Sequence, residues 1–135
     1  MKPLFLSLAF IGSSLVIQTA LAHHAFSAEY DAQKPITLKG TLTKMEWTNP
    51  HGWIYVDVKD EGGKTVNWAI EFGAPNALLR RGIRKSDFPE GIEVTVSGYC
   101  AKNGSPTVNG TNVKLPDGRD LYTGSSGTGA PGVNQ

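Results

Sequence analysis

The three histidines of this chain fall into two groups that together could bind a metal ion. His23 and His24 are adjacent, and His51 lies in the segment Asn49-Pro50-His51-Gly52. If His23 becomes the first residue of a processed chain, its α-amine and its ring can bind one ion, because an α-amine has a reference pKa of about 7.7–8.0 and loses its proton readily to a competing metal. Nitrogen ligands of this kind suit copper, zinc and nickel, and a tetragonal arrangement favours copper(II) or nickel(II). We therefore expect His23, His24 and His51 to form a metal site, with copper as the first choice. A chelate built around the ring of His24 is a related alternative.

The first 22 residues have the three parts of a secretory signal peptide. Lys2 supplies a positive charge, residues 4–17 are mostly apolar, and Ala20-Leu21-Ala22 fits the small-residue pattern that precedes a cleavage site. The apolar run is shorter than the roughly 20 residues that a membrane span needs. We expect cleavage after Ala22, a periplasmic or secreted protein, and no membrane attachment of the processed chain.

Composition indicates one domain that does not bind nucleic acid. Removing residues 1–22 from the 135-residue chain leaves 113 residues, enough for one compact domain. The remaining residues include 12 Lys and Arg against 12 Asp and Glu, whereas nucleic-acid-binding domains usually carry a clustered positive surplus. Cys100 is the only cysteine, so an internal disulfide is excluded.

The first half of the domain shows the two-residue alternation of β-strands. Apolar residues alternate over residues 36–42, and the phase then changes, which predicts a bulge near Thr43 and Lys44. Residues 49–52 have the composition of a tight turn. A second strand over 53–59, a hairpin loop over 60–64 and a third strand over 65–72 follow.

The second half predicts one short helix followed by two more strands. Residues 75–81 begin with Pro, end with two cations and are followed by Gly82, as is typical of a helix. Strands are expected over residues 92–101 and 108–115, and a disordered tail over 123–135. Three strands, a helix and two strands is the order of the OB-fold, so we expect residues 23–122 to form a mainly β, OB-like five-stranded barrel with one short helix between strands 3 and 4. A six-stranded sandwich is the alternative.

Aromatic and acidic residues in the strands have structural and functional interpretations. Trp53 and Tyr55 alternate with aliphatic residues, so they are the best candidates to be exposed and, with Asn49, to contact a ligand. The acidic residues Glu46, Asp57 and Glu71 could act as acids or bases in a cleft. We expect them instead to face water opposite lysines, namely Lys44, Lys59 and Lys64.

Several separated motifs resemble one family of small exported bacterial proteins that is classed as a domain of unknown function. The matching segments are His23-His24-Ala25-Phe26, Trp47-Thr48-Asn49-Pro50-His51, residues 56–60 and Pro75-Asn76-Ala77-Leu78. The resemblance extends to about Leu121 and implies export, an OB-like fold and a binding role. It implies no established activity.

Three functions follow as hypotheses. The first is a non-enzymatic exported protein that binds copper through His23, His24 and His51. The second is a module that binds a small molecule or a protein partner through Trp53, Tyr55 and Asn49, without a metal. The third is a redox or hydrolytic enzyme that uses the same histidines, although the chain contains no G-x-S-x-G, Walker, H-E-x-x-H or paired C-x-x-C motif.

Overall fold

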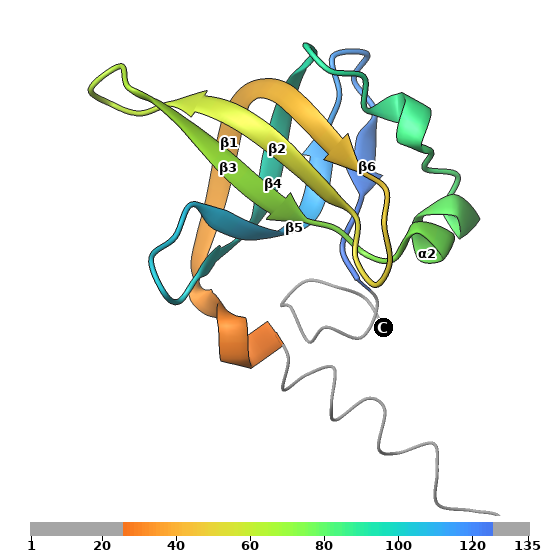
Figure 1. Cartoon of the computed structure of the whole chain (residues 1–135), viewed down its shortest axis with the longest axis horizontal. Helices are drawn as coiled ribbons and strands as arrows, with labels where there is room; N and C mark the ends of the chain where they lie inside the picture. Colours follow the sequence, from red (N-terminus) through yellow and green to blue (C-terminus); the bar gives the residue numbers. More distant parts are fainter. Residues whose placement is uncertain (1–25, 126–135) are drawn as a thin grey trace, which may run out of the picture.

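The computed structural model describes residues 26–125, which form a mainly β structure (Figure 1). A helical turn over residues 26–29 precedes the first strand. The strands are β1 (Tyr30–Glu46), β2 (Trp53–Lys59), β3 (Thr65–Glu71), β4 (Glu93–Ala101), β5 (Thr107–Lys114) and β6 (Asp120–Tyr122). The helix α2 (Pro75–Arg80) and the 3-10 turn η1 (Lys85–Asp87) lie between β3 and β4, so the predicted helix is confirmed. No helix within the described residues is long and apolar enough to cross a membrane.

The strands form one six-stranded sheet in the order β3-β2-β1-β4-β5-β6. All neighbours in this order are antiparallel, and β3 also pairs in parallel with β5, residues 69–71 lying beside residues 107–109. The pairings therefore lead from β1 through β2, β3, β5 and β4 back to β1. The expected count of five strands is one too small, because β6 adds a short strand to the edge of β5.

β1 pairs with both β2 and β4, and this requires a bend. Residues 35–41 pair with β4 and residues 41–46 pair with β2, and Figure 1 shows the strong curvature of this strand. The register with β2 shifts between Leu42 and Lys44, as the change of phase in the sequence predicts. A Cβ at Gly40 would lie 2.2 Å from the carbonyl oxygen of Asp57, so only glycine fits there.

Two hydrophobic clusters hold the sheet together. The main core contains the apolar face of every long strand together with Leu78 of α2, and its largest fully buried side chain is Phe72. A smaller cluster joins the helical turn to the start of β1 and the end of β4. Its members are Phe26, Tyr30 and Ala101, with Tyr99 packed against them. The ring of Phe26 lies 5.8 Å from that of Tyr30 and 5.7 Å from that of Tyr99. This second cluster fixes the path by which the chain enters the domain.

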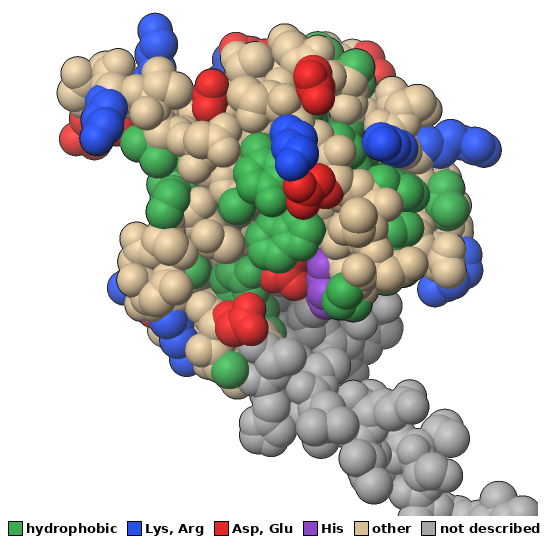
Figure 2. All heavy atoms as spheres, viewed as in Figure 1, with side chains coloured by type: hydrophobic (Ala, Val, Ile, Leu, Met, Phe, Trp, Pro, Cys, Tyr) green, Lys and Arg blue, Asp and Glu red, His purple; other side chains and the backbone are tan. Residues whose placement is uncertain are grey.

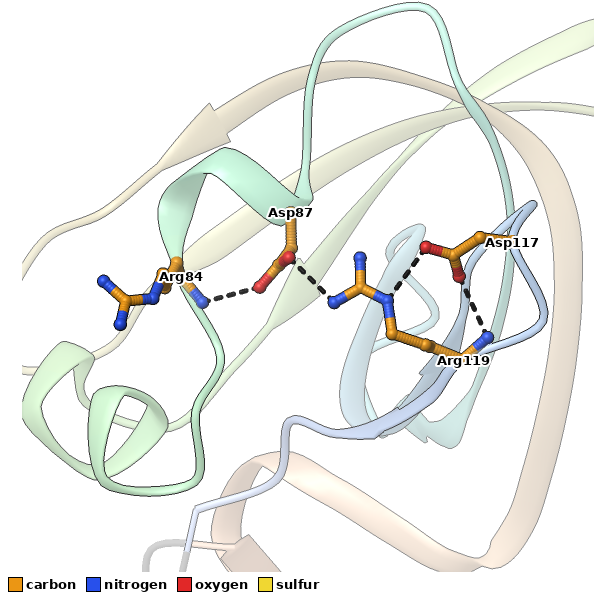
Figure 3. A network of polar contacts seen from close by, with 4 residues as sticks. All are labelled: Arg84, Asp87, Asp117 and Arg119. Carbon is orange, nitrogen blue, oxygen red and sulfur yellow. Dashed lines mark hydrogen bonds and ion pairs between the residues drawn. The ribbon is translucent and has the colours of Figure 1, made fainter.

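Charged residues connect η1 to the turn between β5 and β6. Nη1 of Arg119 lies 2.9 Å from Oδ1 of Asp87, and its Nε lies 2.8 Å from Oδ2 of Asp117 (Figure 3). Asp87 also accepts a hydrogen bond of 2.8 Å from the backbone nitrogen of Arg84. Arg119 and Asp117 are exposed, so this network orients two loops more than it stabilises the fold.

Both ends of the domain differ from the sequence-based expectation. β1 begins at Tyr30, six residues before the apolar alternation that starts at residue 36. Thr123, expected to begin a disordered tail, is 0% exposed. Its carbonyl accepts a 2.8 Å hydrogen bond from Gly73, and its amide donates a 2.9 Å bond to Thr111. Residues 123–125 therefore belong to the ordered domain, because they pair with backbone that the sheet leaves free, while residues 126–135 lie outside the described part.

We expect Gly98→Ala to destabilise the protein, because a Cβ there would lie 2.2 Å from the carbonyl oxygen of Asn109 and 2.6 Å from a methyl of Val108. Forcing extra atoms into a packed region costs about 1–3 kcal/mol, which urea unfolding will measure. Gly62→Ala is the control, since its nearest atom is the end of the Asp60 side chain at 3.3 Å and exposed substitutions change stability by about 0.5 kcal/mol or less. Equal stability of the two variants would contradict the close approach of β4 and β5.

Candidate functional site

Within residues 26–125, the ring of His51 is hydrogen-bonded through one of its two nitrogens, Nδ1. His51 lies in the loop between β1 and β2, and its Nδ1 is 3.0 Å from the carbonyl oxygen of Phe72 and 2.9 Å from Oε1 of Glu71. A carbonyl can only accept a hydrogen bond, so Nδ1 carries the proton. In the neutral ring Nε2 then has a free lone pair, which is the form that binds a metal ion or takes up a proton.

Glu71 is the buried group that positions His51. It lies at the end of β3 with only 9% of its surface exposed. Its Oε2 accepts a hydrogen bond from the hydroxyl of Tyr30 on β1, so Glu71 joins three separate segments of the chain. Burial, reinforced by the neighbouring Glu71, raises the pKa of the Tyr30 phenol far above its usual range. The expectation that Glu71 faces water opposite a lysine is therefore wrong.

Alternation along β3 alone could not reveal this burial. Ile70 and Phe72 lie on one face of β3, and Glu71 lies on the other. The sequence pattern assigned the face of Glu71 to solvent. That face is covered at the end of β3 because Tyr30 packs with Phe26 over the outside of the sheet. The covering residues are 41 or more positions away in sequence, and no local pattern in β3 announces them.

A cleft of about 400 Å³ opens beside this hydrogen-bonded group, and we refer to it as the His51 cleft. The loop contributes residues 48–51, and Phe26, Trp53, Glu71 and Asn109 contribute further walls. Figure 2 shows acidic side chains, hydrophobic side chains and the histidine gathered on this face of the molecule. The loop is held against the end of β3 by hydrogen bonds from Gly52 to Gly73 and from Phe72 to Gly52. The peptide bond between Asn49 and Pro50 is cis.

Two more carboxylates, those of Glu29 and Glu46, border the cleft. Glu46 forms an ion pair with Lys44, which lowers the pKa of the Glu46 carboxyl, and it accepts a 3.2 Å hydrogen bond from the hydroxyl of Tyr55. Glu46 therefore lies beside a lysine, as expected for the acidic residues of the strands. Asp57 instead accepts a 2.8 Å hydrogen bond from Asn67.

The structure brings together some of the predicted site residues. Asn49, His51 and Trp53 all border the His51 cleft, whereas Tyr55 does not border it and contacts it only through Glu46. His23 and His24 lie outside the described residues. Sequence reasoning missed Glu29, Tyr30 and Asn109, because their proximity to Glu71 depends on the pairing of β3 with β5 and on the packing of the helical turn. Glu71 itself was considered, but not as a buried residue.

One aliphatic hydroxyl borders the His51 cleft among the described residues, and it does not contact the imidazole. This hydroxyl belongs to Thr48 and donates to the backbone carbonyl of His51 at 3.3 Å instead of to its ring. A nucleophile activated by His51 would have to contact its ring. Residues 26–125 contain no group of three or more metal-ligating side chains, so a metal at His51 needs further ligands from outside this range.

The bond to Glu71 should control the protonation of His51. This bond is the largest cause that raises the pKa of the His51 imidazole, and partial burial opposes it. Because the folded-state pKa is raised, the ion pair stabilises the fold at pH values below about 6.5, the unfolded value. Its contribution is lost as the pH rises through the folded pKa.

We predict that Glu71→Gln lowers the pKa of His51, as followed by NMR titration of its imidazole in metal-free protein. Glu61→Gln removes an equal charge from the distant tip of the β2–β3 hairpin and should leave that pKa unchanged. An unchanged value in Glu71→Gln would show that the carboxylate does not contact the ring.

Comparison with known proteins identifies the family but no activity. Residues 13–111, most of the chain, match the model of a family of unknown function, DUF6152. No curated protein matches this chain. The match covers the first four strands, most of β5 and every residue of the hydrogen-bonded group at His51. The chain therefore belongs to DUF6152, a family of unknown function.

Proposed function

We propose that this is an exported, non-enzymatic binding protein in which β1 to β5 form an OB-like barrel and His51 binds copper together with His23 and His24. The observation that carries the proposal is the state of the His51 ring. Its Nδ1 is occupied by Glu71 and Phe72, which leaves Nε2 as a preoriented ligand. The ring of strand pairings from β1 through β2, β3, β5 and β4 supports the barrel.

The two hydrogen-bond acceptors of His51 Nδ1 are typical of histidines that bind a metal ion. Such histidines usually donate their second ring nitrogen to a carboxylate or a backbone carbonyl, which fixes the ring and raises its basicity as a ligand. His51 has both acceptors within 3.0 Å. Glu71 is in turn fixed by the hydroxyl of Tyr30. The protein thus maintains the tautomer that metal binding requires.

The path of the chain supports a contribution from the first residues of the processed protein. Phe26 borders the same cleft as His51. Because one residue spans at most about 3.6 Å, the Cα of His23 lies within about 11 Å of the Cα of Phe26, and the Cα of His24 within about 7 Å. The amine of His23 exists only after cleavage following Ala22, so copper binding depends on export and processing. Copper is favoured because amine and imidazole nitrogens suit it and the described part of the cleft contains carboxylates but no thiolate.

Copper(II) titration of correctly processed protein tests this proposal. We expect one copper per chain, and His51→Ala should weaken binding by more than about 100-fold, since loss of a second-shell partner alone costs about 10–100-fold. One extra residue before His23 should weaken it similarly by displacing the amine, and native mass spectrometry will verify the first residue. Tyr122→Phe, at a residue that does not border the cleft, is the control. Binding that survives both changes would contradict the proposed site.

The positioning role of Glu71 gives a second, graded prediction. Glu71→Gln keeps His51 but removes the charged acceptor, so we expect copper affinity to fall by about 10–100-fold. Glu61→Gln should leave it unchanged. Affinity should also fall in wild-type protein as the pH drops below the raised pKa of His51, because the proton then occupies Nε2. Equal affinities in the two Gln variants would exclude Glu71 as a positioning residue.

The His51 cleft also favours a second candidate function, the binding of a small organic molecule. Its volume of about 400 Å³ exceeds what a metal ion needs, and it lies within the usual range of ligand pockets. Trp53 and Asn49, both predicted as ligand contacts, lie on its walls. This function does not require copper and can coexist with it.

A further inference from the structure

We infer that the His51 cleft takes a ligand bearing a positively charged N–H donor, such as a primary ammonium group. This inference rests on the second candidate function, that the cleft binds an organic molecule, and specifies the chemical class of that molecule. It follows from the polar atoms that line the cleft, which are predominantly hydrogen-bond acceptors with negative charge.

Asn109 is the observation that points to a missing donor. It lies on β5 directly beside Glu71 of β3, borders the cleft and is only 4% exposed. Its Oδ1 is buried and has no hydrogen-bond partner within residues 26–125. An unsatisfied buried acceptor costs about 1–3 kcal/mol, so such atoms are normally paired with water, an ion or a ligand. A donor placed in the cleft would satisfy it.

The charges around the cleft favour a cation over an anion. Three carboxylates border it, those of Glu29, Glu46 and Glu71, and none of the described residues on its walls is Lys or Arg. Lys44 offsets the charge of Glu46 from outside the cleft, and His51, when protonated, offsets that of Glu71, which leaves Glu29 as the uncompensated carboxylate. The Glu29 carboxylate is exposed and takes part in no ion pair or hydrogen bond within the described range, so it remains available to a ligand. A carboxylate or phosphate ligand would meet repulsion here.

Trp53 adds an aromatic surface and indicates the direction in which a ligand extends. Trp53 and Glu29 border both the His51 cleft and a second hollow of about 330 Å³, whose other walls include Asn103, Ser105 and Thr107. An aromatic face attracts a cation placed over it, with Trp the strongest of the three rings. A molecule with an ammonium group near Glu29 and Asn109 could therefore lie across Trp53 with its uncharged part toward the second hollow.

Three matched probes test the inference on processed, EDTA-treated protein: phenethylamine, phenethyl alcohol and 3-phenylpropionate. They share a phenyl ring and differ mainly in the charge of the other end. We expect phenethylamine to shift the NMR signals of the Trp53 indole and the Asn109 side-chain amide, with a dissociation constant at least about tenfold lower than that of the alcohol. The carboxylate should bind more weakly still.

Variants locate the binding. Glu29→Gln and Asn109→Ala should each weaken phenethylamine binding about tenfold, whereas Glu61→Gln should not. Glu29 is exposed, so its substitution leaves folding intact even if that of Asn109 does not. Equal affinity for the amine and the alcohol, no binding of any probe, or equal effects of Glu29→Gln and Glu61→Gln would overturn the inference. Copper titration of the same samples is read separately, so failure of amine binding leaves the copper proposal standing, and the reverse also holds.

Discussion

The buried carboxylate of Glu71 is the constraint on which the functional face of this protein depends. Removing a carboxylate from water is costly unless donors surround it. Here the donors are the Tyr30 hydroxyl and the His51 imidazole, which come from the start of β1 and from the loop before β2. Because each must be in place to compensate the charge, the requirement holds the helical turn, the loop and the end of β3 together. The same requirement fixes which nitrogen of His51 is free.

Close packing of the strand backbones allows the groups around Glu71 to lie next to one another. Glycines at positions 40 and 98 let β1 and β4 lie against neighbouring backbone at distances that no side chain would permit. The bulge after Leu42 allows β1 to pair with β4 along one half and with β2 along the other. The parallel pairing of β3 with β5 then places Asn109 beside Glu71. The cleft is thus formed where the four strands β1, β2, β3 and β5, the helical turn and one loop converge.

The two proposed occupants of the cleft depend on different atoms. A copper ion would use Nε2 of His51 and nitrogens from the start of the processed chain. An ammonium group would use the acceptors of Glu29 and Asn109 and the face of Trp53. Membership of the family shows neither. Both proposals depend on one property of the site, a set of electron-pair donors that border the same cleft.

The sequence by itself determined the local features. Alternating apolar residues predicted β2 almost to the residue, the change of phase predicted the bulge at Thr43, and Pro75 and Gly82 predicted α2, because strand period, bulges and helix ends depend on near neighbours. It also singled out His51, Asn49 and Trp53. Only the tertiary structure decided that Glu71 is buried, that Thr123 is ordered and that Asn109 lies at the cleft. Those outcomes depend on contacts between segments far apart in the chain, and a carboxylate on the outer face of a strand has the same sequence pattern whether water or a tyrosine covers it.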